Sequence, residues 1–258
     1  MPNPSVGLQF RGEKGYNDNM KPYLSIIIPA HNEENRLPNA FGAINSFLKG
    51  QKYKAEVIVV ENGSSDKTAQ ITRKFAKKYK YIKLMEVETR GKGLAVKQGM
   101  LKARGEYRFI CDADLSMPIS ELPKFLPPES AGYDLIIGVR EGKGAKRIGE
   151  PFKRHFMGRI FNLIIKLTIL PGFEDTQCGF KMFSKVAAKD LFGTQKLSGI
   201  GFDIELLYLA RKKGYKIKEV PITWYFDADS RMRLFEDSLK ALFEIWQIRK
   251  AWWTGGYN

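Results

Sequence analysis

The first half of the chain alternates short apolar runs with stretches of helical periodicity, and this alternation restricts its possible folds more than any other feature. We expect strands over Tyr23–Pro29, Glu56–Val60, Ile82–Val87, Tyr107–Cys111 and Asp134–Gly138, and helices over Asn35–Lys49, Asp66–Tyr79 and Lys92–Arg104. Strands that alternate with helices are joined by right-handed crossovers and form a mostly parallel sheet. The sequence therefore predicts an α/β fold, a Rossmann-like sheet flanked by helices.

Polar side chains follow three of these expected strands. The segment after the first runs from Pro29 to Glu34, the segment after the second from Glu61 to Asp66, and the fourth ends in Asp112-Ala113-Asp114. Ligands of parallel sheets bind beyond the carboxyl ends of the strands. We therefore expect the functional site at this rim.

Asp112 and Asp114 are the strongest chemical signal. Carboxylates two residues apart at a strand end can point the same way. Such a pair, with coordination positions left open, suits Mg²⁺ or Mn²⁺ bridging a diphosphate, where the metal would act as a Lewis acid. The alternative is an Asp-rich turn that caps a helix beginning near Pro118.

Two glycine-containing segments on the rim each allow two interpretations. In the segment from Glu61 to Thr68, polar groups could contact a nucleobase or ribose, while Ser64 or Ser65 caps the following helix. In the segment from Arg90 to Gly93, the glycines and the helix N-terminus could bind phosphate, or could form an ordinary turn.

The formal net charge of +15 indicates an anionic partner: nucleic acid, acidic lipid or a phosphorylated substrate. We find no helix-turn-helix, zinc or aromatic RNA-binding motif, so we expect no nucleic-acid partner. A basic loop could capture an acceptor phosphate or be merely solvated; it contains Arg140, Lys143, Lys146, Arg147, Lys153 and Arg154. A catalytically inactive scaffold is disfavoured because both carboxylates of the acidic pair are present.

Two stretches have the character of interfacial helices. From Phe156 to Leu170 a narrow polar stripe interrupts an apolar helix, and the segment 229–258 mixes tryptophans with Lys and Arg. Such faces suit docking on an anionic membrane surface, or packing against the sheet. The segment 1–20 has no signal-peptide character, and no apolar run reaches the ~20 residues needed to span a bilayer. We expect a peripheral protein on the cytoplasmic face of a membrane.

Taken together, the motifs resemble glycosyltransferase family 2 of the GT-A fold. Within it, the chain is similar to the group of dolichyl-phosphate glucosyltransferases and dolichyl-phosphate mannose synthases. The similarity runs from Tyr23 to at least Trp224. Besides the rim segments, it is carried by the segments from Asp175 to Lys181 and from Phe202 to Leu207, which are closer to the glucosyl branch.

The resemblance implies roles for individual residues. Pro29, Ala30, Glu33 and Lys92, with Glu61 or Asn62, would bind the nucleotide-sugar donor; Asp112 and Asp114 the metal and diphosphate; Arg140 and Arg154 the phosphate of a polyprenyl acceptor; Asp175 would be the catalytic carboxylate; and Ser230, Arg231 and Arg233 would close over the donor. The domains would be a flexible N-terminus (1–22), the GT-A domain (23–228) and an amphipathic C-terminal helix (229–258).

The implied reaction is inverting transfer of a hexose, with glucose from UDP-glucose as the first expectation. The alternatives are mannose from GDP-mannose, or transfer to a sugar hydroxyl, which would need Asp175 or Asp203 as a true base. The chain departs from the family in three places. Glu61-Asn62 stands where Asp-Asp is common, Ser116 stands where the mannosyl branch often has Gln, and the spanning helices of several relatives are absent.

Overall fold

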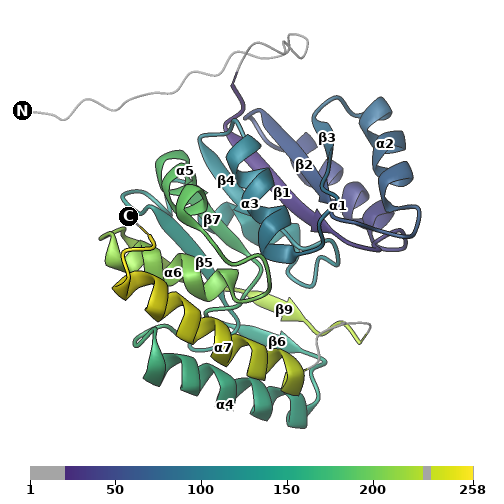
Figure 1. The fold of residues 1–258 in the computed structure, drawn as a ribbon. Coiled ribbons are helices and arrows are strands. Elements are labelled where there is room, and N and C mark those ends of the chain that lie inside the picture. Colours follow the sequence, from purple (N-terminus) through teal and green to yellow (C-terminus); the bar gives the residue numbers. More distant parts are fainter. Residues whose placement is uncertain (1–20, 229–233, 258) are drawn as a thin grey trace, which may run out of the picture.

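The computed structural model describes residues 21–228 and 234–257. Its centre is a seven-stranded sheet of order β3-β2-β1-β4-β7-β5-β8 (Figure 1). The elements of the first half are β1 (Leu24–Ala30), α1 (Leu37–Lys49), β2 (Ala55–Glu61), α2 (Thr68–Lys78), β3 (Ile82–Glu86), α3 (Lys92–Lys102) and β4 (Tyr107–Ile110). All strand pairs among β1–β4 are parallel, so the predicted α/β fold is confirmed.

The second half is less regular. Its elements are a 3₁₀ helix (Ile119–Phe125), β5 (Leu135–Val139), β6 (Lys146–Ile148), α4 (Phe152–Thr168), β7 (Lys181–Ser184), α5 (Lys185–Thr194), α6 (Phe202–Lys212), β8 (Ile217–Pro221), β9 (Thr223–Tyr225) and α7 (Leu234–Trp253). Strand β7 lies antiparallel between β4 and β5, while β6 and β9 form a separate parallel pair. The helix expected near Pro118 is the 3₁₀ helix, and the expected helix Phe156–Leu170 is α4.

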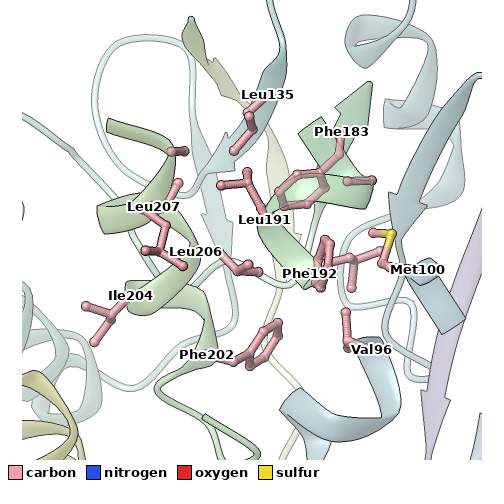
Figure 2. Packing of buried hydrophobic residues seen from close by; sticks show 14 of the residues in the cluster. Val96, Met100, Leu135, Phe183, Leu191, Phe192, Phe202, Ile204, Leu206 and Leu207 are labelled. Atoms are coloured by element: carbon pink, nitrogen blue, oxygen red, sulfur yellow. The ribbon is translucent and has the colours of Figure 1, made fainter. Parts of the chain in front are cut away.

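Successive side chains along each strand point to opposite faces of the sheet, so the core has two layers, one on each face. Ile27 of β1 faces the cluster formed with α3, α5 and α6, whereas Ile26 and Ile28 face the cluster formed with α1 and the 3₁₀ helix. Figure 2 shows the first cluster, where Phe202 of α6 packs near Val96 of α3. Burial on both faces explains why β1 and β2 are continuous apolar runs in the sequence.

Helices α4 and α7 lie side by side, and α7 also contacts α6 (Figure 1). Among the helices that the structure describes, none has the length and apolar character to cross a bilayer. The expected C-terminal helix is α7. The expected flexible N-terminus falls almost wholly outside the described residues, and the proposed domain limits stay a prediction.

Candidate active site

A cavity of about 590 Å³ opens at the carboxyl ends of β1, β2 and β4. The site residues expected from sequence that line it are Pro29, Ala30, Glu33, Asn62, Lys92, Asp112, Asp114, Arg140, Arg154 and Asp175. Glu61 is not among the lining residues, and Ser230, Arg231 and Arg233 lie outside the described residues. The fold thus brings the acidic pair and part of the basic loop, distant in sequence, to one cavity.

Hydrogen bonds between two loops build the donor side of the rim. The backbone N–H of Asn32 donates to Ser64 Oγ (3.0 Å), and the N–H of Ser65 donates to Asn32 Oδ1 (2.8 Å). The N–H of Glu33 likewise donates to Thr68 Oγ1 (2.8 Å). The two serines therefore tie the β2–α2 loop to the β1–α1 loop, and the expectation that one of them caps the helix was wrong. Helix α2 begins at Thr68, whose N–H is accepted by Asp66 (2.9 Å).

The two candidates for nucleobase contact have different positions. The Glu61 carboxylate is buried and accepts the backbone N–H of Ser64, so it stabilises the turn. Asn62 lines the cavity, and its backbone carbonyl oxygen lies 3.0 Å from Nδ1 of His31, which is another lining residue. Of the pair, Asn62 is the one placed to meet a ligand.

Asp112 and Asp114 lie at the end of β4. Lys92 Nζ lies 2.7 Å from Asp112 Oδ1, and Asp114 Oδ1 accepts the N–H of Ser116 (2.9 Å). Burial and the neighbouring charge of Asp112 raise the pKa of Asp114 above its ordinary value. A cation between the two carboxylates would relieve this repulsion.

The carboxylates of Asp112 and Asp114 suit a divalent cation whose remaining ligands come from water and substrate. No group of three His, Cys, Asp or Glu side chains with metal-binding geometry occurs among the described residues. Mg²⁺ commonly needs only one or two protein carboxylates, with water and substrate phosphates supplying the other ligands. The oxygen pair of Asp112 and Asp114 fits this mode.

Gly179 makes room for the Asp112 carboxylate. A Cβ atom placed on Gly179 would lie 2.1 Å from Asp112 Oδ2. Gly91 and Gly93, in contrast, make room for protein backbone: a Cβ on either would lie within 2.8 Å of Ser198 or Gly199 carbonyl oxygen. The close approach at these two glycines is made by the 197–199 loop, whereas the Lys92 side chain between them lines the cavity.

An ion pair organises a second group of lining residues, the basic wall. Asp175 accepts from Arg140 Nε (2.6 Å) and Nη2 (3.0 Å), a bidentate contact. Burial acts to raise the pKa of Asp175, but the Arg140 guanidinium outweighs it and lowers the pKa to about 2. Asp175 is therefore ionised throughout the neutral pH range.

The arginines of the basic loop lie over aromatic rings, and Arg147 also contacts an acidic side chain. The guanidinium carbons of Arg140 and Arg147 lie 5.6 and 5.2 Å from the centre of the Trp224 ring, and that of Arg154 lies 5.0 Å from Phe226. Glu141 accepts from Arg147 (2.8 Å) and contacts His155 (3.0 Å). The wall remains basic, but acidic partners set the orientation of its arginines.

Sequence reasoning missed several lining residues. Arg36 bridges Glu33 (3.0 Å) and Asp227 (2.7 Å), so it joins the β1–α1 loop to the segment after β9. No sequence motif around Arg36 predicts this role, because one of its partners, Asp227, lies 191 residues away.

Asp203, the alternative base, does not line the cavity and instead pairs with buried Lys181 (2.7 Å).

Comparison with known proteins agrees with this fold and site. The model of the family "Glycosyl transferase family 2" matches residues 25–192. The chain belongs to this family, it is a glycosyltransferase, and its fold is GT-A.

The individual relatives carry more specific names than the family does. The chain is 32% identical over 246 residues to a dolichyl-phosphate beta-glucosyltransferase of Trichomonas vaginalis, covering 90% of this chain and 74% of the relative. It is 32% identical over 266 residues to the dolichyl-phosphate beta-glucosyltransferase of Saccharomyces cerevisiae, covering 94% and 79%. Among solved structures, a glucosyl-3-phosphoglycerate synthase from Mycobacterium tuberculosis, in complex with Mn²⁺, UDP and phosphoglyceric acid, aligns with a TM-score of 0.64. Its identity is 19%, over 88% of this chain and 78% of that one.

Proposed function

We propose that this glycosyltransferase moves glucose from UDP-glucose to a polyprenyl phosphate of dolichyl type, with inversion at the anomeric carbon. The observation that carries the proposal is one cavity lined both by an acidic pair, here called the donor wall, and by arginines, here called the acceptor wall. The names of the T. vaginalis and S. cerevisiae relatives support glucose and dolichyl phosphate.

On the donor wall, Asp112 and Asp114 would hold Mg²⁺ or Mn²⁺. When bound, the ion would offset the negative charge that develops on the departing diphosphate. Pro29, Ala30, Glu33 and Asn62 would bind the nucleoside. All four line the cavity, and hydrogen bonds join the two loops that carry them, which supports this assignment. A structural neighbour crystallised with Mn²⁺ and UDP supports this kind of donor site.

On the acceptor wall, Arg140 and Arg154 would bind the phosphate monoester. Its second pKa is about 6, so a phosphate oxygen is already a competent nucleophile at neutral pH. That oxygen forms the new bond to C1 of the sugar while the bond from C1 to the diphosphate breaks, and UDP leaves. Asp175 would then orient Arg140 through the bidentate contact, since a carboxyl group with a pKa of about 2 is a weak base.

The direct test offers UDP-glucose, UDP-GlcNAc and GDP-mannose separately, with a short-chain polyprenyl phosphate and Mg²⁺ or Mn²⁺, and detects glycolipid by mass spectrometry. We expect lipid-linked glucose, and loss of product in Asp114→Asn. Glu129→Gln, an exposed residue outside the cavity, is the charge-matched control. Product only from GDP-mannose would replace glucose with mannose. Transfer only to glycans would replace the lipid phosphate with a hydroxyl acceptor.

We also propose that α4 and α7 dock on an anionic membrane surface. Apolar side chains are exposed on both: Phe152 (80%) and Leu167 (78%) on α4, and Phe243 (59%) and Trp253 (77%) on α7. Cations such as Lys166, Arg249 and Lys250 accompany them, which is the composition of interfacial helices. The arginines of α4 that line the cavity would then lie near lipid headgroups.

Co-sedimentation with phosphatidylcholine vesicles, with and without phosphatidylglycerol, tests this docking. We expect binding that increases with anionic lipid, and a loss of about tenfold in Phe152→Ser/Leu167→Ser, because less apolar surface is transferred from water. Val186→Ser changes an apolar residue on α5 that is 70% exposed, and it serves as the control. Equal loss in both proteins would contradict docking through α4.

A further inference from the structure

Lys92 places a positive charge on the carboxylate pair. It is the first residue of α3, its side chain is 36% exposed, and its Nζ lies 2.7 Å from Asp112 Oδ1. The other oxygen of Asp112 abuts Gly179, as the 2.1 Å approach of a Cβ there shows. The Asp112 carboxylate is therefore bound to an ammonium group on one side and enclosed by backbone on the other.

A second, fully buried ion pair lies in the same part of the molecule. Lys181 Nζ contacts Asp203 Oδ1 at 2.7 Å and also donates to the carbonyl oxygen of Cys178. Lys181 has no exposed surface, and the side chain of Asp203 is 7% exposed. Neither belongs to the donor or acceptor walls, yet burying two charges carries a desolvation cost. The pair needs an explanation beyond stability.

The start of α3 lies against the start of α6, because a Cβ atom placed on Gly93 would lie 2.8 Å from Phe202 Cβ. Lys92 and Asp203 are the chain neighbours of these two residues. Burial acts to lower the pKa of Lys92, but the charges of Asp112 and then Asp203 outweigh it and raise the pKa above its ordinary value. The Lys92 ammonium group is therefore stabilised by two carboxylates: Asp112, which lines the cavity, and Asp203, which is paired with Lys181.

We propose that Lys92 is an internal counter-ion of the acidic pair, which a divalent cation displaces from Asp112, and that Asp203 is the positioning residue that retains the displaced ammonium. The inference rests on the proposed assignment of Asp112 and Asp114 to the metal. The physical reason is competition: an oxygen that accepts an ammonium hydrogen bond has to give it up to bind the ion, so part of the ion's binding free energy is spent on displacement.

This competition predicts that two substitutions shift the metal affinity in opposite directions. Lys92→Met removes the competitor and tightens metal binding. Asp203→Asn removes the alternative partner, holds the ammonium more firmly on Asp112 and weakens metal binding. A role confined to packing or to donor binding would not produce this pair of opposite shifts.

The experiment measures Mn²⁺ alone binding to the full chain at 150 mM salt, without nucleotide or acceptor, from the electron paramagnetic resonance signal of free Mn²⁺. For Lys92→Met we expect about tenfold tighter binding than wild type, equivalent to about 1.4 kcal/mol. For Asp203→Asn we expect weakening of about threefold, with thermal unfolding checked because the residue is buried. Lys102→Met, on the exposed end of α3, controls for the change in net charge.

Mn²⁺ binding by Lys92→Met that is equal to or weaker than wild type, or not measurable, would overturn the inference. So would equal tightening in Lys102→Met. Asp112→Asn separates this result from the proposed function. If it abolishes Mn²⁺ binding while Lys92→Met changes nothing, the metal assignment stands and the counter-ion role fails. Failure of the transferase proposal would appear separately, as absence of glycolipid in the transfer assay.

Discussion

The two halves of the fold hold their site residues in different ways. In the half formed by β1–β4, hydrogen bonds from backbone N–H groups to side-chain oxygens of the neighbouring loop position the rim, as from Asn32 N–H to Ser64 Oγ and from Ser65 N–H to Asn32 Oδ1. In the half formed by β5–β9, side-chain ion pairs do so, as between Arg140 and Asp175. Removing one such hydrogen bond costs about 1 kcal/mol, whereas removing one partner of a buried ion pair costs about 3–5 kcal/mol. The second half should therefore be the more sensitive to single substitutions.

The point where the halves meet should be the most sensitive of all. Asp112 belongs to the β4 end, and Gly179 belongs to the segment that leads into β7. Gly179→Ala would push its methyl group into the Asp112 carboxylate, which backbone on one side and Lys92 on the other prevent from moving freely. We expect transfer to fall by about a hundredfold or more, since misplacing a reacting group by ~1 Å costs on that order.

Turnover of Gly179→Ala at saturating donor, together with its thermal unfolding midpoint, measures this effect. Gly193→Ala is the matched control, because a Cβ on Gly193 meets nothing within 4 Å. Loss of turnover with an unchanged unfolding midpoint is the expected result. Wild-type turnover in Gly179→Ala would mean that Asp112 does not need its observed position, and the contrast between the halves would lose its central point.

The next largest effect is expected for the ion pair of the second half. Asp175→Asn leaves the Arg140 side chain, which is 21% exposed, without its counter-charge, and this should lower the free energy of unfolding by about 3 kcal/mol. Urea unfolding at pH 7, with Glu129→Gln as control, measures it. A difference below 0.5 kcal/mol, on the order of a surface substitution, would show that the pair is not what holds this wall.

The pH dependence of that difference follows from the lowered pKa. The pKa of Asp175 is about 2 in the folded protein and about 3.9 in the unfolded chain. Its stabilising contribution is therefore complete above about pH 5 and is lost progressively as the pH falls through the folded pKa of about 2. The gap between wild type and Asp175→Asn should stay constant from pH 8 to about pH 5 and shrink below about pH 5. A gap that changes between pH 5 and pH 8 would require a different titrating group.

The same contrast explains how much the sequence could predict. The expected helix Asn35–Lys49 and the observed α1 (Leu37–Lys49) differ by two residues, because periodicity and the adjacent polar rim are local signals. Strand β7 was not predicted: it has four residues, begins with the buried Lys181, and gains its stability from strands distant in sequence. In the site, the motifs and the resemblance identified Asp112, Lys92, Asp175 and Arg140, but not which of these residues are neighbours.

Those neighbours are set by tertiary contacts. The partners Arg140 and Asp175 are 35 residues apart, and Lys181 and Asp203 are 22 apart. In the sequence each is one charged residue among many, and nothing local distinguishes a buried Lys181 from a solvated lysine. Gly179 belongs to a motif that the sequence analysis used. Its role, to leave space for Asp112, could not be predicted, because Asp112 follows β4, which ends at Ile110, 69 residues before Gly179.

The smallest effect is expected for an ion pair in the first half that is close in sequence but exposed. Arg73 of α2 contacts both oxygens of Glu86 at the end of β3 (2.6 Å), and the two side chains are 55% and 49% exposed. Solvent screens such a pair, so a double-mutant cycle with Arg73→Ala and Glu86→Ala should give a coupling of about 0.5 kcal/mol or less, reduced further in 1 M salt. The geometry is as close as that of Arg140 and Asp175, so burial alone separates the two expectations. A coupling of several kcal/mol at Arg73 would show that distance, and not burial, decides how ion pairs stabilise this fold.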